Sequence, residues 1–129
     1  MRMIFVNLPV KDLEASKSFF GELGFEFNPD FSDETAACMI VAENISVMLL
    51  VEERFRDFIN DDIADATQTT EAINCLSADS KEQVDDTVAK AIAAGGKPWK
   101  PAMDEGPMYG ASFQDLDGHV WELMYMGQQ

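Results

Sequence analysis

The predicted order of strands and helices repeats along this chain, and no other feature of the sequence restricts its fold as strongly. The first half predicts a strand, a helix and then three strands, at residues 3–9, 13–23, 25–28, 35–42 and 45–51. The second half predicts the same order, with a strand at 71–77, a helix between Ser80 and Gly95, an edge strand at 97–100 and a hairpin within 108–125. Each βαβββ module leaves one face of its sheet uncovered, so pairing two modules gives one core and a concave sheet between them. We therefore predict an α+β fold in which two βαβββ modules form a half-open barrel.

Local signals mark the ends of these elements. Asp12 predicts the cap of the first helix, and Gly24 predicts its stop. Ser80 and Gln83 have the spacing of a capping box at the start of the second helix. Pro9 is expected to close the first strand, because proline lacks the N–H that a strand ladder needs.

The two halves share little residue identity, but their strands can be aligned. Residues 5–10 fall on residues 73–78 at an offset of 68, and residues 47–50 fall on residues 121–124 at an offset of 74. A chain of 129 residues suits one compact domain. We expect modules at about 1–52 and 71–127, joined by a connection over 53–70.

The hairpin within 108–125 carries the most informative charged residue of the second half. Asp117-Gly118 predicts a two-residue turn with positive φ at both positions. Glu122 is the only acid inside the second strand of this hairpin, where it points either to solvent or into a cleft. In the second case, period-two alternation sends Val120 and Met124 to the same side, and Trp121, Leu123 and Tyr125 to the other.

The charge of the chain restricts its partners. With 9 basic and 24 acidic residues the net charge is −15, which opposes binding to a nucleic-acid backbone and favours cationic ligands or partners. No apolar run is long enough to cross a membrane, and the N-terminal residues pass straight into a strand pattern, so we expect a cytoplasmic protein without a membrane partner. Cys38 and Cys75 lie in apolar runs and are interpreted as reduced core residues, with a reactive thiol as the alternative.

The connection predicts a short helix followed by a polar loop. The helix carries Phe55, Phe58 and Ile59, which either pack over the end of a sheet or form a lid over a ligand. Acidic residues at 61, 62 and 65 lack the glycine and the spacing of a calcium loop, so a solvated turn is the better interpretation.

Three motifs in this order resemble the vicinal oxygen chelate superfamily, which includes glyoxalase I, bleomycin-resistance proteins and extradiol dioxygenases. They are residues 7–16 (NLPVKDLEAS), residues 22–25 (ELGF) and residues 115–123 (DLDGHVWEL). The resemblance covers nearly the whole chain and implies the glyoxalase-like fold. Within the superfamily the chain looks like a predicted lactoylglutathione lyase-type protein, and the resemblance to its small members implies a homodimer.

In metal-dependent members the resemblance implies four metal ligands, one on the first and one on the last strand of each module. The matching positions here are Phe5, Met48, Ile73 and Glu122. Only Glu122 offers a ligand for a hard or borderline metal, and an alignment slip would bring only an amide, Asn7 or Asn74, into place. We therefore expect no metal and no other cofactor. His119, the single histidine, is interpreted as a surface or turn residue, with a ligand role as the alternative.

The same comparison predicts a mostly apolar ligand cavity with Glu122 and Asn7 as its polar points. Its other predicted members are Phe5, Met48, Ile73, Met108, Tyr109 and Met124. The methionines are either an adaptable wall of the cavity or ordinary core, and Tyr109 and Trp99 either stack on a planar ligand or complete the core.

These residues favour a protein that binds a small hydrophobic or cationic molecule, as bleomycin-resistance proteins do, without the metal site of the family. The alternative is a lyase or isomerase of the lactoylglutathione lyase type, in which Glu122 is the general base that removes a proton next to a carbonyl. A third possibility is a structural relic that binds a partner protein.

Overall fold

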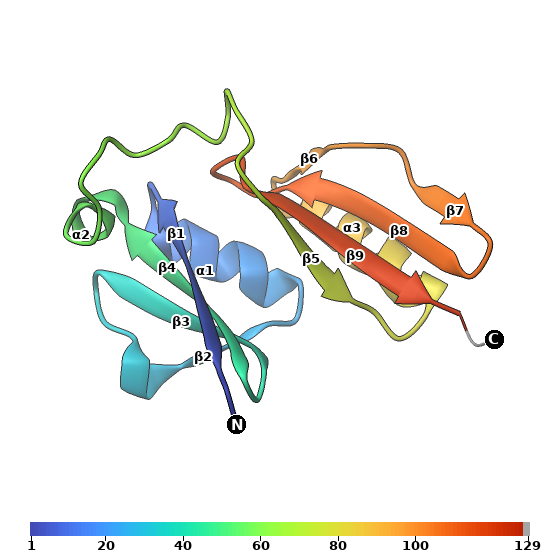
Figure 1. Cartoon of the computed structure of the whole chain (residues 1–129), viewed down its shortest axis with the longest axis horizontal. Coiled ribbons are helices and arrows are strands. Elements are labelled where there is room, and N and C mark those ends of the chain that lie inside the picture. Colours follow the sequence, from blue (N-terminus) through green and yellow to red (C-terminus); the bar gives the residue numbers. More distant parts are fainter. Residues whose placement is uncertain (128–129) are drawn as a thin grey trace. The chain divides into compact units, whose positions relative to one another are not determined.

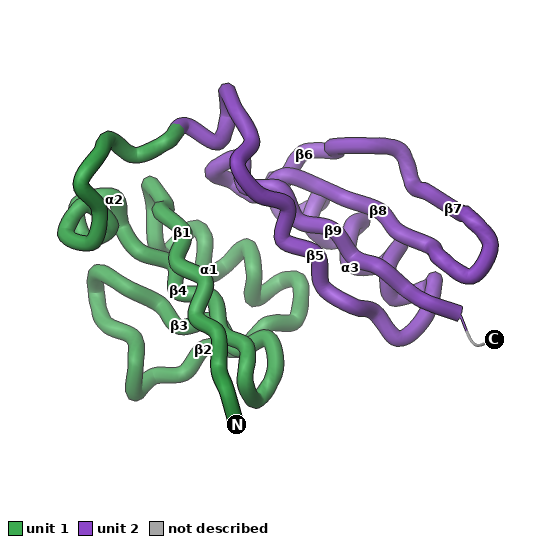
Figure 2. Tube along the Cα trace, viewed as in Figure 1, with its two compact units in different colours: residues 1–64 green, residues 65–129 purple. Residues whose placement is uncertain are grey.

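The computed structural model describes residues 1–127 and divides the chain into two compact units. The first unit is Met1–Ala64 and the second begins at Asp65, as the colours of Figure 2 show. Each unit contains one sheet and one long helix, so each corresponds to one module of the predicted repeat (Figure 1).

The first unit has a four-stranded sheet in the order β1-β4-β3-β2. Strand β1 pairs in parallel with β4, and the other neighbours are antiparallel. Its elements are β1 (Ile4–Val10), α1 (Leu13–Glu22), β2 (Glu26–Asn28), the short 3-10 helix η1 (Pro29–Phe31), β3 (Ala36–Ala42), β4 (Ile45–Val51) and α2 (Glu52–Arg56).

Helix α1 begins and ends where its sequence signals predict. The Asp12 carboxylate accepts a hydrogen bond from the backbone N–H of Ala15 (3.1 Å), and Gly24 has φ 100° just after the helix. Phe19 and Phe20 are almost completely buried, and their rings meet edge to face at 5.0 Å. The apolar side of α1 therefore forms the core of the first unit together with buried residues of β3 and β4, such as Met39 and Leu49.

The second unit has a five-stranded sheet in the order β5-β9-β8-β6, with β7 also paired to β8. Strand β5 is parallel to β9, and the remaining pairs are antiparallel. Its elements are β5 (Ile73–Ser77), α3 (Lys81–Ala93), β6 (Lys97–Pro98), β7 (Met103–Glu105), β8 (Met108–Gln114) and β9 (Val120–Met126). Ser80 caps α3 by accepting a hydrogen bond from the backbone N–H of Gln83 (3.0 Å), as predicted.

Strand register confirms the internal repeat. In the first unit Asn7 lies opposite Met48, and in the second unit Cys75 lies opposite Glu122. The two pairs are related by the same offsets, 68 and 74, that align the two halves of the sequence. The modules therefore repeat in residue register as well as in element order.

Two sequence predictions about strands are wrong. Pro9 lies inside β1 instead of closing it, and this is tolerated because β1 is an edge strand whose outer side has no ladder partner in its sheet. Strand β7 lies between the predicted edge strand and the predicted hairpin, where the sequence predicts no strand, and its three residues pair with β8.

The predicted two-residue turn at Asp117-Gly118 is also wrong. Strands β8 and β9 are joined by the five residues 115–119, and within residues 1–127 only glycines have positive φ, so Asp117 does not adopt it. The loop folds around the buried Asp115 carboxylate. Its Oδ1 accepts from the backbone N–H groups of Asp117 (2.9 Å) and His119 (3.0 Å), and its Oδ2 accepts from the Trp121 indole (2.9 Å).

No helix within residues 1–127 has the length and apolar character needed to cross a membrane.

Candidate functional site

Glu122 lies on the face of the second sheet that is turned away from α3. The opposite face is identified by Tyr109, whose hydroxyl donates to the Asp85 carboxylate on α3 (2.6 Å), and by Asp104, which pairs with Lys81 on α3 (3.7 Å). Side chains alternate between the two faces of a strand, so Glu122 lies on the face opposite to Tyr109. Its side chain is half-buried. The predicted alternation is confirmed, because Trp121 and Leu123 are buried on the side of the helix.

Three polar side chains form a row across this outer face. Cys75 on β5 and Ser112 on β8 are both register partners of Glu122 on β9. The Ser112 hydroxyl also accepts a hydrogen bond from the backbone N–H of Lys100 (3.2 Å), which attaches the segment before β7 to the sheet. The carboxylate of Glu122 thus lies between a thiol and a hydroxyl.

The thiol of Cys75 is held in its protonated form. Its pKa is raised from 9.0 to about 11, first by partial desolvation and then by the hydrogen bond to Glu122 and the negative charge of that carboxylate. Cys75 is nevertheless exposed, so its interpretation as a core residue is wrong, whereas Cys38 is buried as predicted. A protonated thiol next to Glu122 acts as a hydrogen-bond donor and is a poor nucleophile.

The predicted methionines of the second unit share the face of Glu122. Met124 lies two residues further along β9, and Met108 is the register partner of Met126. A Cβ placed on Gly110 would lie 2.9 Å from the Met124 methyl carbon, so the Met124 side chain covers the space that the glycine leaves. Ile73 is also on this face and is 58% exposed.

Tyr109 is the predicted ligand-binding residue that lies apart from this group. It is on the α3 face, where the ammonium of Lys81 lies 5.5 Å from the centre of its ring. The hydrogen bond to Asp85 raises the pKa of Tyr109, followed by desolvation and the charge of Asp85 itself. Tyr109 therefore does not share the face of Glu122.

Three predicted site residues belong to the first unit and share one face of its sheet. Asn7 lies opposite Met48, and Phe5 lies opposite Ser46, so Phe5, Asn7 and Met48 have the same parity. Phe5 is 47% exposed, and the Asn7 amide donates to the backbone carbonyl of Phe5 (3.2 Å). Apart from Tyr109, the predicted residues thus share one face of the sheet in each unit, and their roles in ligand binding stay predictions.

The side chains at the four positions where the resemblance implies metal ligands offer one carboxylate among them. Phe5 and Ile73 have no lone pair, Met48 offers a soft thioether, and Glu122 alone offers a carboxylate. Within residues 1–127, no three side chains of His, Cys, Asp or Glu converge so that they could hold a metal ion. His119 lies in the loop that joins β8 to β9, and its backbone N–H donates to Asp115.

Asp115 is a structurally important residue of the loop between β8 and β9 that the sequence did not reveal. It is 5% exposed, and burial raises the pKa of its carboxyl, while the charge of His119 and the hydrogen bonds from Trp121, Asp117 and His119 act in the opposite direction. Asp115 therefore organises the loop and Trp121. Cys75 and Ser112 were also missed, although the offset of 68 that relates Asn7 to Cys75 contained the signal for the first.

An open groove of about 410 Å³ lies in the first unit, and none of the predicted site residues lines it. Its walls are Glu14, Lys17, Phe27, Pro29, Ser32, Asp33 and Glu34. Hydrogen bonds from the Thr35 hydroxyl and backbone lower the pKa of Asp33, which shows that this carboxylate is already engaged in its own turn. The Asp33 carboxylate in the wall of this groove therefore already accepts hydrogen bonds from its own turn.

A family model and several solved structures match this chain. The model, described as bleomycin resistance protein-like N-terminal, matches residues 2–42. A hypothetical protein from S. aureus is 28% identical with a TM-score of 0.82, and the match covers 97% of this chain and 94% of that one. No curated protein matched the chain in sequence.

Two further structures carry informative names. A glyoxalase/bleomycin resistance protein/dioxygenase family enzyme from Burkholderia phytofirmans is 19% identical with a TM-score of 0.79, over 98% of this chain and 99% of that one. A fosfomycin resistance protein from Listeria monocytogenes is 21% identical with a TM-score of 0.68, over 97% and 93%. At these identities the likeness shows the fold. The match over residues 2–42 and the glyoxalase-like fold of both units together support the resemblance of this chain to the vicinal oxygen chelate superfamily, whose fold it has.

Proposed function

We propose that this protein binds a small hydrophobic or cationic molecule, in the manner of bleomycin-resistance proteins, without the metal site of the superfamily. The observation that carries the proposal is the setting of Glu122. It is a half-buried carboxylate on the outer face of the second sheet, flanked by Cys75 and Ser112 and bordered by methionines. A single negative charge among a thiol, a hydroxyl and thioethers suits an organic cation with an apolar body.

The chemistry of the positions equivalent to metal ligands supports the same proposal. Of the four positions at which the resemblance implies ligands, Phe5, Met48, Ile73 and Glu122, only Glu122 offers a carboxylate. Phe5 and Ile73 have no lone pair, and the Met48 thioether is a soft ligand that zinc, manganese and iron do not prefer. Metal analysis of the purified protein tests this part directly, and stoichiometric zinc, nickel, manganese or iron would overturn it.

The binding proposal is tested with probes that differ only in charge. We expect benzyltrimethylammonium to quench or shift the tryptophan fluorescence of the protein, and its uncharged carbon isostere to bind more weakly. The variant Glu122→Gln should lose this preference for the cation, because the amide keeps the shape but not the charge. Glu82→Gln, on the exposed surface of α3, is the matched control and should keep it. Bleomycin is a third probe, and equal binding of all probes to both variants would remove Glu122 from the site.

The second candidate function is a lyase or isomerase of the lactoylglutathione lyase type. It rests on the same carboxylate, which would accept the proton from the carbon next to a carbonyl while the Cys75 thiol and Ser112 hydroxyl orient the acid. Turnover of the hemithioacetal of methylglyoxal and glutathione that disappears in Glu122→Gln favours this candidate. Binding of that compound without turnover leaves the binding function.

We also propose that the protein is a homodimer and that it lies in the cytoplasm. Analytical ultracentrifugation tests the first, since a monomer at micromolar concentration would contradict it. Cell fractionation tests the second.

A further inference from the structure

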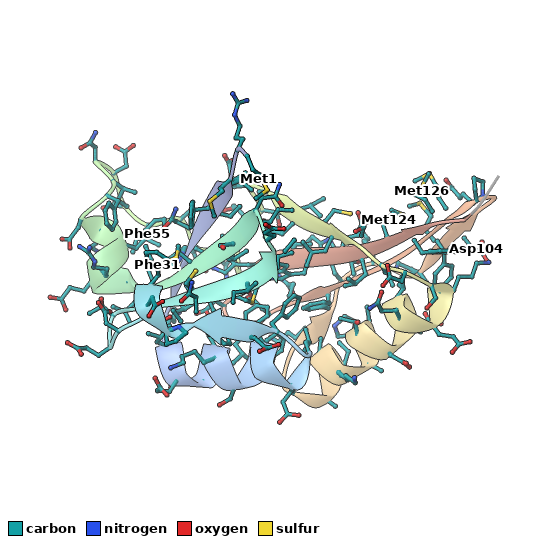
Figure 3. All side chains as sticks on the ribbon, turned by 90° about the horizontal axis from the view of Figure 1, so that it is seen from below. Met1, Phe31, Phe55, Asp104, Met124 and Met126 are labelled. Carbon is teal, nitrogen blue, oxygen red and sulfur yellow. The ribbon has the colours of Figure 1, made fainter. Side chains whose placement is uncertain are left out.

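Four methionine side chains occur together at one end of the second sheet, and the ligand proposed above does not require them as a group. They are Met103 on β7, Met108 on β8, and Met124 and Met126 on β9, and we call them the methionine patch. Register places all four on the face turned away from α3. Figure 3 shows Met124 and Met126 on that side of β9.

Gly110 lies between two members of the patch and leaves space that the thioether of one of them, Met124, fills. Met103 and Met124 lie on opposite sides of Gly110, each as its register partner. A Cβ on Gly110 would lie 3.2 Å from the Met124 sulfur, so this sulfur already occupies the space above the glycine. Met108 and Met126 are direct partners on neighbouring strands, where side chains of one face are typically about 5 Å apart at Cβ.

The strand that contributes Met103 is anchored from the other face. Asp104 pairs with Lys81 of α3 at 3.7 Å, and Lys81 also lies 5.5 Å from the ring of Tyr109. Tyr109 in turn donates to Asp85. These contacts hold β7 and β8 against α3 and fix the side to which Met103 points.

The patch also lies in a negative electrostatic environment. Glu105 is the register partner of Met108, and Glu122 lies two residues before Met124 on the same face. The whole chain has a net charge of −15. Such a field attracts cations, while the thioethers select a soft one over calcium or magnesium.

We propose that the methionine patch binds a soft monovalent metal ion, Cu(I), through thioether sulfurs. The patch offers uncharged sulfur ligands from three adjacent strands, and three or four thioethers suit the low coordination number of this ion. This site goes beyond the proposed function, and its test does not depend on any organic ligand or on turnover.

The test uses Ag(I) as an air-stable probe in the full chain carrying Cys75→Ser, which removes the exposed thiol. Titration calorimetry should give one bound Ag(I) per chain. The ¹³C-methyl resonances of Met103, Met108, Met124 and Met126 should shift together. The double variant Met108→Leu, Met124→Leu keeps side-chain volume and should weaken binding by about tenfold or more, as expected for a soft ion that loses sulfur ligands.

Two controls keep the result interpretable. Met3→Leu changes a methionine of the first unit that is 49% exposed and should leave Ag(I) binding unchanged. Met126→Leu changes the most exposed member of the patch, at 56%, and should weaken binding without affecting the fold. Loss of binding on Cys75→Ser, an equal effect of Met3→Leu, or unshifted patch resonances would each overturn the proposal.

Discussion

The two units have the same strand register but different chemistry at equivalent positions. In the first unit the parallel pair β1–β4 brings Asn7 opposite Met48, and in the second the pair β5–β9 brings Cys75 opposite Glu122. One unit therefore presents an amide and a thioether where the other presents a thiol and a carboxylate. The repeat therefore preserves positions on the sheet, while the ionisable side chains at these positions occur in one copy.

The connections between the last two strands of each unit also differ. In the first unit β3 and β4 are joined tightly by Glu43-Asn44, with a bulge between Ile40 and Ala42. In the second unit the five-residue loop encloses the buried Asp115. The second unit thus depends on one carboxylate and one glycine that have no counterpart in the first connection.

The largest expected effect comes from Gly118→Ala. Gly118 has φ 91°, and a Cβ there would lie 2.9 Å from backbone atoms of Ala66 and Thr67. Thr67 is fixed by hydrogen bonds to Asp65, so the backbone cannot easily retreat. Strain of about 1–2 kcal/mol and a clash of similar size should lower the free energy of unfolding by about 3 kcal/mol, measured by urea denaturation.

Two glycines of the first unit are graded controls for this prediction. Gly24 has φ 100° with nothing within 4 Å of its Cβ position, so Gly24→Ala should cost only the strain of about 1–2 kcal/mol. Gly21 is helical and unobstructed, and Gly21→Ala should stabilise by about 0.5–1 kcal/mol. Equal effects at Gly118 and Gly24 would show that the contact with residues 66–67 is unimportant.

The next effect in size is that of Asp115→Asn. The amide oxygen can replace Oδ1, but the amide nitrogen then faces the Trp121 indole N–H, so two donors meet in a buried place. A loss of about 2–3 kcal/mol in unfolding free energy is expected from an unsatisfied buried donor. Asp86→Asn, on the exposed surface of α3, should change it by less than about 0.5 kcal/mol. Similar values for the two variants would contradict a central role of Asp115 in the loop.

Much of this architecture could be predicted from sequence, because it rests on local signals. The caps at Asp12 and Ser80 follow from short-range chemistry, and the strand at 45–51 follows from a nearly continuous run of apolar residues. The Asp117-Gly118 turn could not be predicted correctly, because Asp115 competes for the loop backbone through a contact with Trp121 six residues away.

The candidate site was predicted less completely than the fold. The alternation that turns Glu122 away from α3 could be read from β9 alone. Its neighbours Cys75 and Ser112 come from other strands, so they depend on register, which a single strand does not encode. Proximity to the hairpin predicts Tyr109 beside Glu122, but strand alternation places Tyr109 on the opposite face, next to α3.

The two cysteines, one in each unit, are expected to react differently with a thiol reagent as the pH rises. The raised pKa of Cys75 means that the unfolded chain loses this thiol proton at a lower pH than the folded chain does. The contribution of Cys75 to stability is therefore present below pH 9 and is lost as the pH rises towards about 11. Labelling of Cys75 by iodoacetamide should accelerate over the same range.

Glu122→Gln sharpens this contrast. It removes the carboxylate charge that raises the pKa of Cys75, so labelling should begin at lower pH. Cys38 is 2% exposed and should stay unlabelled in both proteins until they unfold. An unchanged pH profile for Cys75 in the variant would show that the two side chains are not coupled.

The smallest expected effect is that of Glu122→Gln on stability. The side chain is half-buried, and the amide can still accept a hydrogen bond from Cys75, so the free energy of unfolding should change by less than about 1 kcal/mol. Thermal unfolding followed by circular dichroism measures this. A loss as large as that of Asp115→Asn would mean that Glu122 supports the fold.

The parallel pairing of β5 with β9 also has a consequence for the order of folding. Strands β8 and β9 are close in sequence and can pair early, whereas β5 and β9 are far apart in sequence, with α3, β6, β7 and β8 between them. The hydrogen bond of Asn74 to the backbone of Val120 joins residues that are 46 positions apart. The Cys75 thiol and the Glu122 carboxylate therefore meet only when β5 pairs with β9. A local opening that releases β5 from β9 would separate Cys75 from Glu122 while the β8–β9 ladder stays intact, and native-state hydrogen exchange would detect it. Such an opening, far smaller than global unfolding, would be enough to take the candidate site apart.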